Sequence, residues 1–235
     1  MKLAIMQPYF FPYIGYFQLI NAVDQFILLD EVQYIRHGWI NRNRILKPGG
    51  GVQYITVPLQ KHRQKSIIKE VHISEGDDWK MRILRQLEHY RKKAPFFKSV
   101  CNLLEEAFES NATQISVLNQ HLLQKACNYI GINTKIITSS SLLLDYTAVN
   151  AKDEWALTIS EQLKASEYIN PIGGIELFEK EKFRTKNIKL SFLKSNDIVY
   201  SQNQKGFETN LSIIDVMMFN EPKAIKNMID HYQIV

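Results

Sequence analysis

The first 30 residues carry the pattern that most restricts what this chain can fold into. Lys2–Met6 is a short apolar run that stops at a Gln-Pro pair, which is typical of a buried strand. Apolar residues at helical spacing follow in residues 15–23, and a second apolar run at residues 25–29 ends at Asp30. A strand, a helix and a strand in so short a space predict a β-α-β unit, the smallest unit of an α/β sheet.

Helical patterns dominate the middle of the chain, in residues 77–131. Asp77 and Asp78 are candidate N-caps for the first of these helices, and Gly131 is a candidate C-cap for the last. Further strands are predicted at residues 52–59, 67–73, 132–139, 188–193 and 197–201, and further helices at 151–169, 211–219 and 222–231. We therefore predict a single α/β domain over residues 1–235. In it, the N-terminal β-α-β core carries a helical insert or subdomain at 77–131, and the C-terminal strands and helices return to the core.

Composition narrows the classes of protein. Apolar residues make up 45% of the 235 residues and charged residues 23%, which is ordinary for a globular protein. Cys101 and Cys127 fall at apolar helical positions, so neither a disulfide framework nor a Cys/His metal site is expected. Gln and Pro interrupt the N-terminal apolar run, and no run approaches about 20 apolar residues. We therefore expect a cytoplasmic protein with no membrane span, and the net charge of +5 favours acidic partners without choosing among them.

The first candidate site is the turn between the first strand and the first helix, residues 7–16. Ligands of α/β sheets collect outside the carboxyl ends of the strands, and the N-terminus of the following helix favours an anion. Gln7 is a polar residue at the end of a buried strand, which indicates function, whereas the aromatic residues of 9–13 taken singly are more typical of core. The turn from Pro12 to Gly15 is also similar to the Pro-x-His-x-Gly-His turn of nucleotidylyltransferases, but it has no histidine and is one residue shorter.

The second candidate site is the irregular, polar segment at residues 31–44, together with Asp30 before it. A carboxylate that follows a strand can act as a base or hold a ligand hydroxyl, and His37 can titrate near neutral pH. The segment also carries arginines suited to phosphate or carboxylate and asparagines suited to a sugar or an amide, with a tryptophan between them: Arg42, Arg44, Asn41, Asn43 and Trp39. The alternative is a solvated loop in which these side chains satisfy backbone groups.

A basic run at residues 61–65, which begins at Lys61, would extend this positive surface if the strand at 52–59 folds back beside it. Alone, such a run is more typical of a solvated loop. The sequence contains no Gly-x-Ser-x-Gly elbow, Walker loop, dinucleotide-binding fingerprint or His-Glu-x-x-His pair. Neither cysteine lies near a polar cluster, which argues against a cysteine nucleophile.

Several of these residues belong to a longer pattern. It comprises Gln-Pro-Tyr-x-x-Pro-Tyr-x-Gly-Tyr-Phe at 7–17, Asp24, Asp30, Val-Gln-Tyr at 32–34, Trp-x-Asn-Arg-Asn at 39–43, Val57-Pro58, Tyr168, Gly173-Gly174, Tyr-Ser-Gln at 200–202 and Phe-x-x-Asn-Leu-Ser-x-x-Asp at 207–215. This pattern resembles the WbqC-like family over nearly the whole chain. Two departures lie near the glycine pair, where Asn170-Pro171 replaces a common Ser-Gly and Glu176-Leu177 a common Tyr-Leu. If that segment binds ligand, the difference alters substrate choice.

The resemblance implies a role in the synthesis of bacterial O-antigen or other surface polysaccharides. It suggests transfer of an aminoacyl (glycyl) or acyl group to a nucleotide-linked amino sugar, with Asp30 or His37 as the catalytic residue that deprotonates the amine. The substrate-binding residues expected from the motifs and the basic run are Gln7, Tyr16, Gln33, Trp39, Asn41, Arg42, Asn43, Lys61, Tyr168, Tyr200 and Asp215.

The expected acyl donor is a thioester of CoA or of an acidic carrier protein, and we expect no bound cofactor, no metal and no nucleic-acid partner. Two alternatives remain open. One is a nucleotidylyltransferase-like enzyme, and the other is a non-catalytic partner that binds a sugar nucleotide or an acidic protein.

Overall fold

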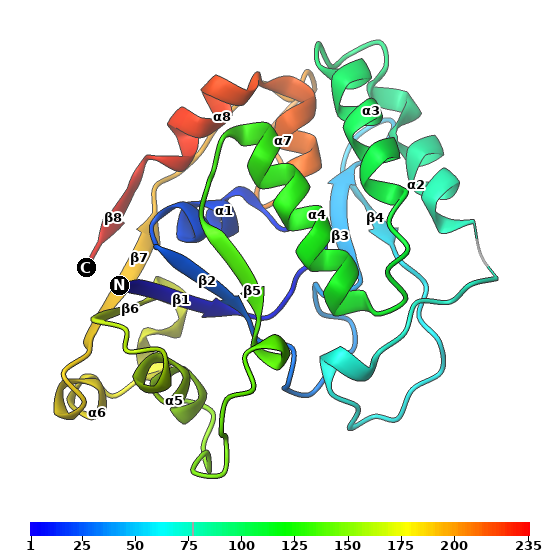
Figure 1. Cartoon of the computed structure of the whole chain (residues 1–235). Helices are drawn as coiled ribbons and strands as arrows, with labels where there is room; N and C mark the ends of the chain where they lie inside the picture. The colour runs from blue at the N-terminus through cyan, green and yellow to red at the C-terminus, as the bar shows by residue number, and fades with distance from the viewer. Residues whose placement is uncertain (77) are drawn as a thin grey trace.

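The computed structural model describes residues 1–76 and 78–235, and within these residues six strands form one sheet (Figure 1). Their order across the sheet is β5 (Lys135–Thr138), β2 (Gln25–Leu28), β1 (Lys2–Met6), β6 (Glu167–Pro171), β7 (Lys189–Ser195) and β8 (Tyr232–Ile234). Neighbouring strands are parallel except β7 and β8, which are antiparallel. The predicted α/β fold is confirmed, and so is the N-terminal β-α-β unit, in which β1 and β2 pair in parallel.

The direction in which the sheet grows reverses at β1. The chain first builds outward from β1 through β2 to β5, and then crosses back to place β6 and β7 on the other side of β1. Such a doubly wound order leaves a crevice outside the carboxyl ends of the two strands where the direction changes, here β1 and β6. The turn after β1 therefore lies where sheets of this type bind their ligands.

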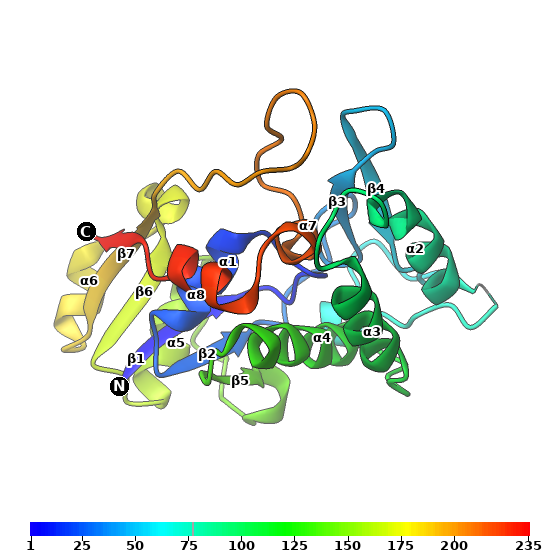
Figure 2. The ribbon, with the colours of Figure 1, turned by 90° about the horizontal axis from the view of Figure 1, so that it is seen from above.

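Helices cover both faces of the sheet (Figure 2). The helices α1 (Ile14–Asn21), α4 (Ile115–Ile130) and α8 (Pro222–Ile229) share a core with Ala4 and Phe26, whereas α5 (Glu154–Gln162) and α6 (Lys180–Thr185) share a second core with Leu3 and Ile5. Successive strand residues point to opposite faces of a sheet, so adjacent residues of β1 enter different cores. Burial on both faces explains why the strands read as continuous apolar runs.

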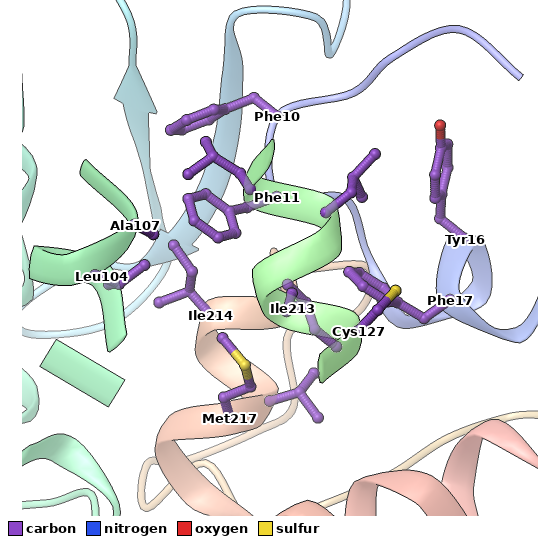
Figure 3. Packing of buried hydrophobic residues seen from close by; sticks show 14 of the residues in the cluster. Phe10, Phe11, Tyr16, Phe17, Leu104, Ala107, Cys127, Ile213, Ile214 and Met217 are labelled. Carbon is purple, nitrogen blue, oxygen red and sulfur yellow. The ribbon is translucent and has the colours of Figure 1, made fainter. Parts of the chain in front are cut away.

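A hairpin and three further helices extend the core on the α1 face. They are β3 (Arg42–Leu46), β4 (Val52–Thr56), α2 (Trp79–Leu87), α3 (Phe97–Phe108) and α7 (Ile213–Phe219). Figure 3 shows Phe11, from the turn after β1, packed among Leu104 of α3 and Ile214 of α7. Short 3-10 helices lie at Ile68–Glu70, Glu88–Tyr90, Ser139–Ser141 and Ile172–Leu177. The turn after β1 is therefore part of the core that joins the sheet to the hairpin.

Local signals placed several helix ends correctly. Asp78 Oδ1 accepts a hydrogen bond from the Met81 amide at the start of α2 (3.3 Å), as expected of an N-cap. Gly131 ends α4 with a φ of 88°, a left-handed conformation that glycine adopts readily. Asp77, the other predicted N-cap, lies outside the described residues.

Other predicted elements were wrong in type or extent. Residues 67–73 form a 3-10 helix and isolated bridges instead of a strand, because backbone amides there donate to the carbonyls of Asp30 and Val32 rather than to a sheet. Residues 197–201 form no regular element. The helix predicted at 151–169 ends at Gln162, because Lys164 turns left-handed with a φ of 55°, and β6 follows.

Candidate functional site

The turn after β1, residues 7–13, is held by buried polar side chains. Asn43 donates from Nδ2 to two successive carbonyl oxygens of the turn (3.0 and 2.8 Å), and Ser212 Oγ donates to the second of these, that of Phe11 (2.8 Å). Asn119 donates from Nδ2 to another carbonyl of the turn (2.8 Å). Phe11 has a φ of 40°, a left-handed conformation that costs free energy for a residue other than glycine. Three side chains from distant segments therefore fix a strained turn at the crevice.

Two cavities open beside this turn. The larger one, which we call the Glu31 cavity, has a volume of about 680 Å³, and Gln7, Glu31, Gln33, Arg36, Lys152 and Trp155 are among its lining residues. The smaller one, the Arg44 cavity, has a volume of about 430 Å³, and Met6, Tyr9, Tyr13, Trp39, Arg44 and Asn210 are among its lining residues. Met6 and Gln7 are consecutive residues at the end of β1, so both cavities reach the same end of that strand. Pro171, at the end of β6, also lines the Arg44 cavity, which places that cavity at the crevice between β1 and β6.

Glu31 supplies a carboxylate to the larger cavity. Its Oε1 accepts a hydrogen bond from Lys69 Nζ (2.9 Å), whereas its Oε2 is buried. Tyr146 packs its ring against Trp155, with 4.7 Å between the ring centroids. Burial, and the hydrogen bond and charge of the Glu31 carboxylate, raise the pKa of the Tyr146 phenol, so the Tyr146 hydroxyl lies beside the second oxygen of Glu31. A carboxylate held by Lys69 and Tyr146 in a cavity wall is suited to exchange a proton with a bound ligand.

Arg44 supplies a cation to the smaller cavity. Its guanidinium lies over the ring of Trp39, 5.4 Å from the ring centroid, and Nη2 makes one long hydrogen bond to the Asn210 carbonyl (3.4 Å). Its Nε is buried and makes no hydrogen bond to any residue of the described ranges. Burial raises the pKa of the Tyr9 and Tyr13 phenols, so both stay protonated at neutral pH and can donate to a ligand.

Gly15 gives the Tyr13 ring its place at this cavity. A Cβ atom at Gly15 would lie 2.4 Å from Cε2 of Tyr13. This glycine therefore makes room for a ring that lines the cavity.

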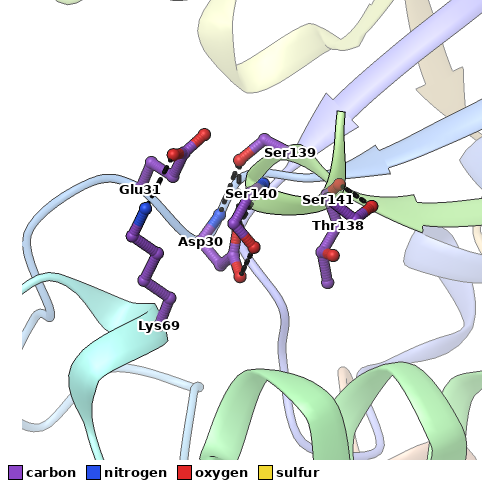
Figure 4. A network of polar contacts seen from close by, with 7 residues as sticks. All are labelled: Asp30, Glu31, Lys69, Thr138, Ser139, Ser140 and Ser141. Carbon is purple, nitrogen blue, oxygen red and sulfur yellow. Dashed lines mark hydrogen bonds and ion pairs between the residues drawn. The ribbon is translucent and has the colours of Figure 1, made fainter. Parts of the chain in front are cut away.

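Asp30, a predicted catalytic residue, is buried and lines neither cavity. Its carboxylate accepts hydrogen bonds from Ser139 Oγ (3.0 Å), the Ser140 amide (3.1 Å) and Ser140 Oγ (2.8 Å), as Figure 4 shows. These bonds tie the end of β2 to the 3-10 helix that follows the neighbouring strand β5. The next residue, Glu31, presents its carboxylate to the cavity instead.

Four predicted substrate-binding residues line the cavities. Gln7 and Gln33 line the Glu31 cavity, and Trp39 and Asn43 line the Arg44 cavity. The amide of Asn43 is fully used by the fold, because Nδ2 bonds to the turn and Oδ1 accepts from the Arg44 amide (2.8 Å). Gln7 and Trp39 are therefore the predicted residues best placed to contact a ligand through their side chains.

Three further predicted residues of the N-terminal segment line neither cavity and are hydrogen-bonded within the fold. Tyr16 is buried, and its hydroxyl donates to the carbonyl of Gln7 (2.7 Å). Asn41 accepts from a tyrosine hydroxyl (2.8 Å) and donates to a backbone carbonyl (2.9 Å). Arg42 donates to two loop carbonyls and lies over the ring of Tyr54, 4.5 Å from its centroid. These contacts give each of the three side chains a role in the fold.

His37 and Lys61 are exposed and line neither cavity. The basic run that contains Lys61 lies beside residues 33 and 34, because Gln33 Nε2 donates to the residue 64 carbonyl (2.9 Å) and the ring of His62 contacts that of Tyr34 (4.9 Å). The run therefore flanks the Glu31 cavity.

The predicted C-terminal residues form two polar contacts inside the fold. Tyr168 is buried in the core shared with α5 and α6, and its hydroxyl donates to Asn170 Oδ1 (2.8 Å). Asp215 is buried and accepts hydrogen bonds from the hydroxyls of Tyr90 and of Tyr200, the latter at 2.6 Å. Burial raises the pKa of Asp215 to about 6, against the lowering effect of the two hydroxyls. None of the three predicted residues lines the Glu31 or the Arg44 cavity, but Tyr200 lines a third cavity, of about 510 Å³, to which Tyr13 also belongs.

The structure also adds residues that the sequence did not select. Lys152 and Trp155 line the Glu31 cavity from the segment before and within α5, far along the chain from its other lining residues, and no local pattern marks them. Glu31 and Arg44 stand in the segment that was selected, next to the predicted residues Asp30 and Asn43. Arg44 was named there as an arginine suited to phosphate or carboxylate, although it was not among the substrate-binding residues expected from the motifs.

Neither metal ligation nor thiol chemistry is indicated elsewhere in the part of the chain that the structure describes. No three His, Cys, Asp or Glu side chains of residues 1–76 and 78–235 gather as a metal site would require. Burial raises the pKa of Cys101 to about 11 and that of Cys127 to about 12, so both thiols are poor nucleophiles at neutral pH. The same residues contain no helix that is both long and apolar enough to pass through a bilayer.

Comparison with known proteins agrees with the motif pattern. A family model described as the WbqC-like protein family matches residues 7–227. The chain is 35% identical over 222 residues to the uncharacterized protein Rv1507c of Mycobacterium tuberculosis (strain ATCC 25618 / H37Rv), and the match covers 93% of each protein. No solved structure matches the chain significantly. The matched region includes both cavities and the turn between them, and the chain belongs to the WbqC-like protein family.

Proposed function

We propose that this protein transfers an acyl or aminoacyl (glycyl) group to the amino group of a nucleotide-linked amino sugar, as a step in the synthesis of bacterial O-antigen or a related surface polysaccharide. The observation that carries the proposal is the pair of cavities that are lined by the consecutive residues Met6 and Gln7. They lie at the carboxyl edge of a doubly wound sheet, where ligands bind. A transfer between two substrates requires two binding sites close to each other, and two cavities at one end of β1 support this requirement.

Glu31 is the proposed base of the reaction. The sugar amine attacks the carbonyl carbon of a thioester, the bond from carbon to sulfur breaks, and the amine proton passes to the Glu31 carboxylate. The thiolate leaves and is protonated in solvent. The ion pair with Lys69 (2.9 Å) holds the carboxylate in place. Asp30 acts in this scheme as a positioning residue, because it fixes the end of the strand that precedes Glu31.

The walls of the two cavities support an assignment of the substrates. The Arg44 cavity combines a guanidinium with aromatic rings, which suits an acidic group joined to a sugar. The Glu31 cavity is larger and carries Arg36, Lys152 and the indole of Trp155. That wall suits the acyl donor, a thioester of CoA or of an acidic carrier protein. We place the reaction in the cytoplasm, with no nucleic acid among the partners.

The test is to incubate the purified protein with nucleotide-linked amino sugars and with acetyl and glycyl thioesters of CoA, and to analyse the products by mass spectrometry. We expect a product whose mass equals that of the sugar nucleotide plus the acyl group. Loss of a general base lowers rates by about 100-fold or more, so Glu31→Gln should lose nearly all turnover. Glu106→Gln, the same change at an exposed position of α3, should turn over normally.

Two results would replace the proposal. Release of pyrophosphate from a nucleoside triphosphate in the presence of magnesium would indicate a nucleotidylyltransferase. Binding of a sugar nucleotide with no new product from any thioester would indicate a non-catalytic partner. Full turnover by Glu31→Gln would support the transferase activity but show that Glu31 is not the base. The variants His37→Gln and Asp30→Asn would then be assayed.

A further inference from the structure

The Arg44 cavity holds a positive charge that lacks a counter-charge. Within the described residues Arg44 makes one side-chain hydrogen bond, at 3.4 Å, although a guanidinium has five N–H donors. Its Nε is shielded from solvent and unpartnered. None of the residues that line the cavity carries a carboxylate. Leaving a shielded charged donor without a partner is unfavourable, so the observed arrangement indicates that an acceptor enters with a ligand.

Arg42 shows how an arginine on the same strand is satisfied when no ligand is needed. It lies two residues before Arg44 on β3, where side chains share a face. Its Nε donates to the Gly38 carbonyl, its Nη2 donates to the His37 carbonyl, and its guanidinium lies over the ring of Tyr54. The fold therefore provides hydrogen-bond acceptors for the guanidinium of Arg42, whereas that of Arg44 has only one long hydrogen bond within the described residues.

The remaining polar groups of the Arg44 cavity are also donors. Within the described residues, the hydroxyls of Tyr9 and Tyr13 and the indole N–H of Trp39 make no hydrogen bond to the protein, and all three side chains line the cavity. The side-chain amide of Asn210 stands beside them. Helix α1 begins next to Tyr13 and has no acidic residue in its first turn, so its dipole adds to the positive potential. A wall of donors around a cation favours an anion with several acceptor oxygens.

We infer that the Arg44 cavity is the diphosphate subsite for the nucleotide-linked substrate, an assignment that rests on the proposed function for the identity of that substrate. The Arg44 fork donates two parallel hydrogen bonds to phosphate oxygens, and the phenols of Tyr9 and Tyr13 donate to the remaining ones. The same rings, with that of Trp39, flank the attached sugar. Because Met6 and Gln7 are adjacent, the sugar then lies between the diphosphate and the Glu31 cavity, where the acyl group is transferred.

The experiment is a calorimetric titration of the protein with inorganic pyrophosphate, with uridine diphosphate and with citrate. Charged hydrogen bonds of this kind change affinity by roughly 10- to 100-fold, so Arg44→Gln should weaken the binding of both diphosphates by that factor. Arg44→Lys keeps the charge and loses the planar guanidinium, so its affinity for diphosphates should lie between that of the wild type and that of Arg44→Gln. Arg85→Gln, which removes the same charge from an exposed position of α2, should bind like the wild type.

The inference and the proposed function can fail separately. Equal affinity of wild type, Arg44→Gln and Arg44→Lys for diphosphates would overturn the subsite even if transfer is observed, and so would tighter binding of citrate than of pyrophosphate. Binding of diphosphates that depends on Arg44, without any transfer product, would support the subsite and overturn the transferase. Where transfer is observed, Arg44→Gln should raise KM for the sugar nucleotide by roughly 10-fold or more and leave KM for the thioester unchanged.

Discussion

Two polar clusters at the carboxyl edge of the sheet differ in whether their hydrogen bonds are made within the protein. Around Asp30, both carboxylate oxygens are bonded to Ser139 and Ser140, and the cluster is closed by protein. Around Arg44, the side chains that line the cavity carry several donors that have no protein acceptor in the described residues. The first cluster joins β2 to the segment after β5, and the second has hydrogen-bond donors that a ligand can use.

The difference separates two meanings of a polar residue in a buried place. A buried polar group that is fully bonded stabilises the fold, and its removal leaves its partners unsatisfied. A shielded group that lacks partners does not stabilise the free protein, and its removal acts on binding. Changes in the closed cluster should therefore lower stability, and changes in the open cavities should lower activity or affinity.

The largest effect is expected for Glu31→Gln, in the open part of the site. The amide cannot accept the amine proton, so kcat should fall by about 100-fold or more. The free energy of unfolding should change by less than about 1 kcal/mol, because the substitution removes an ion pair with Lys69 in which both side chains are partly exposed. Steady-state kinetics measures kcat, and urea unfolding measures stability. A large loss of stability with normal kcat would show that Glu31 belongs to the fold and not to the site.

Asp30→Ala is expected to have the opposite profile. Three donors of Ser139 and Ser140 lose a charged acceptor, so the free energy of unfolding should fall by about 3 to 4 kcal/mol. Diphosphate affinity of the fraction that remains folded should stay within about 3-fold of wild type, because Asp30 lines neither cavity. A stable protein that has lost turnover would show that Asp30, as the sequence suggested, is the base.

Asp215 offers a test by pH, because it is a closed cluster whose carboxyl is hard to ionise. Its pKa in the folded protein is about 6 against an ordinary value of 3.8, so the folded state binds the proton more tightly than the unfolded chain does. The stability that this carboxyl contributes is present at low pH and is lost as pH rises through about 6. Each pKa unit corresponds to about 1.4 kcal/mol, so the loss should be about 2 to 3 kcal/mol between pH 4 and pH 7.

Asp215→Asn cannot ionise and should lack this part of the pH dependence. Urea unfolding of both proteins from pH 4 to pH 7 isolates the contribution as the difference between the two curves. Parallel curves would show that Asp215 ionises normally in the folded state and that the cluster with Tyr90 and Tyr200 is less closed than the structure indicates.

Gly15→Ala is expected to have the smallest effect, and it should lower both stability and diphosphate affinity. The added methyl group overlaps the Tyr13 ring, which must move, at a cost of about 1 kcal/mol in stability. Because that ring lines the Arg44 cavity, diphosphate affinity should fall by roughly 3-fold as well. Calorimetry on this variant would contradict the role of Tyr13 if the affinity stayed equal to that of the wild type.

The sequence predicted the parts of the fold that local patterns encode. Apolar runs and the helical spacing after Gly15 placed β1, α1 and β2, and Asp78 and Gly131 marked helix ends. Strand β6 was missed because its apolar residues continued the spacing of the preceding helix, and only the left-handed turn at Lys164 separates the two. The order of the strands, which creates the crevice, depends on long-range pairing that no local pattern contains.

The candidate site could be predicted to within a residue or two but not to the side chain. The polar segment after β2 was selected, yet Asp30 turns into the protein and Glu31 turns into the cavity. Which of two adjacent carboxylates faces a ligand depends on the serines after β5, more than 100 residues later. The motif residues Tyr168 and Asp215 likewise proved to be bonded within the fold, a distinction that requires the tertiary contacts.

The most direct test of the central claim is the free energy of unfolding of wild type and Arg44→Gln, each measured with and without saturating uridine diphosphate. If Arg44 is kept without a partner for a diphosphate, the ligand-free variant should be at least as stable as the wild type. Uridine diphosphate should then stabilise the wild type by a clearly larger amount than the variant. A variant that is about 2 kcal/mol less stable without ligand, and that gains as much from uridine diphosphate as the wild type does, would show that Arg44 belongs to the fold and not to the site.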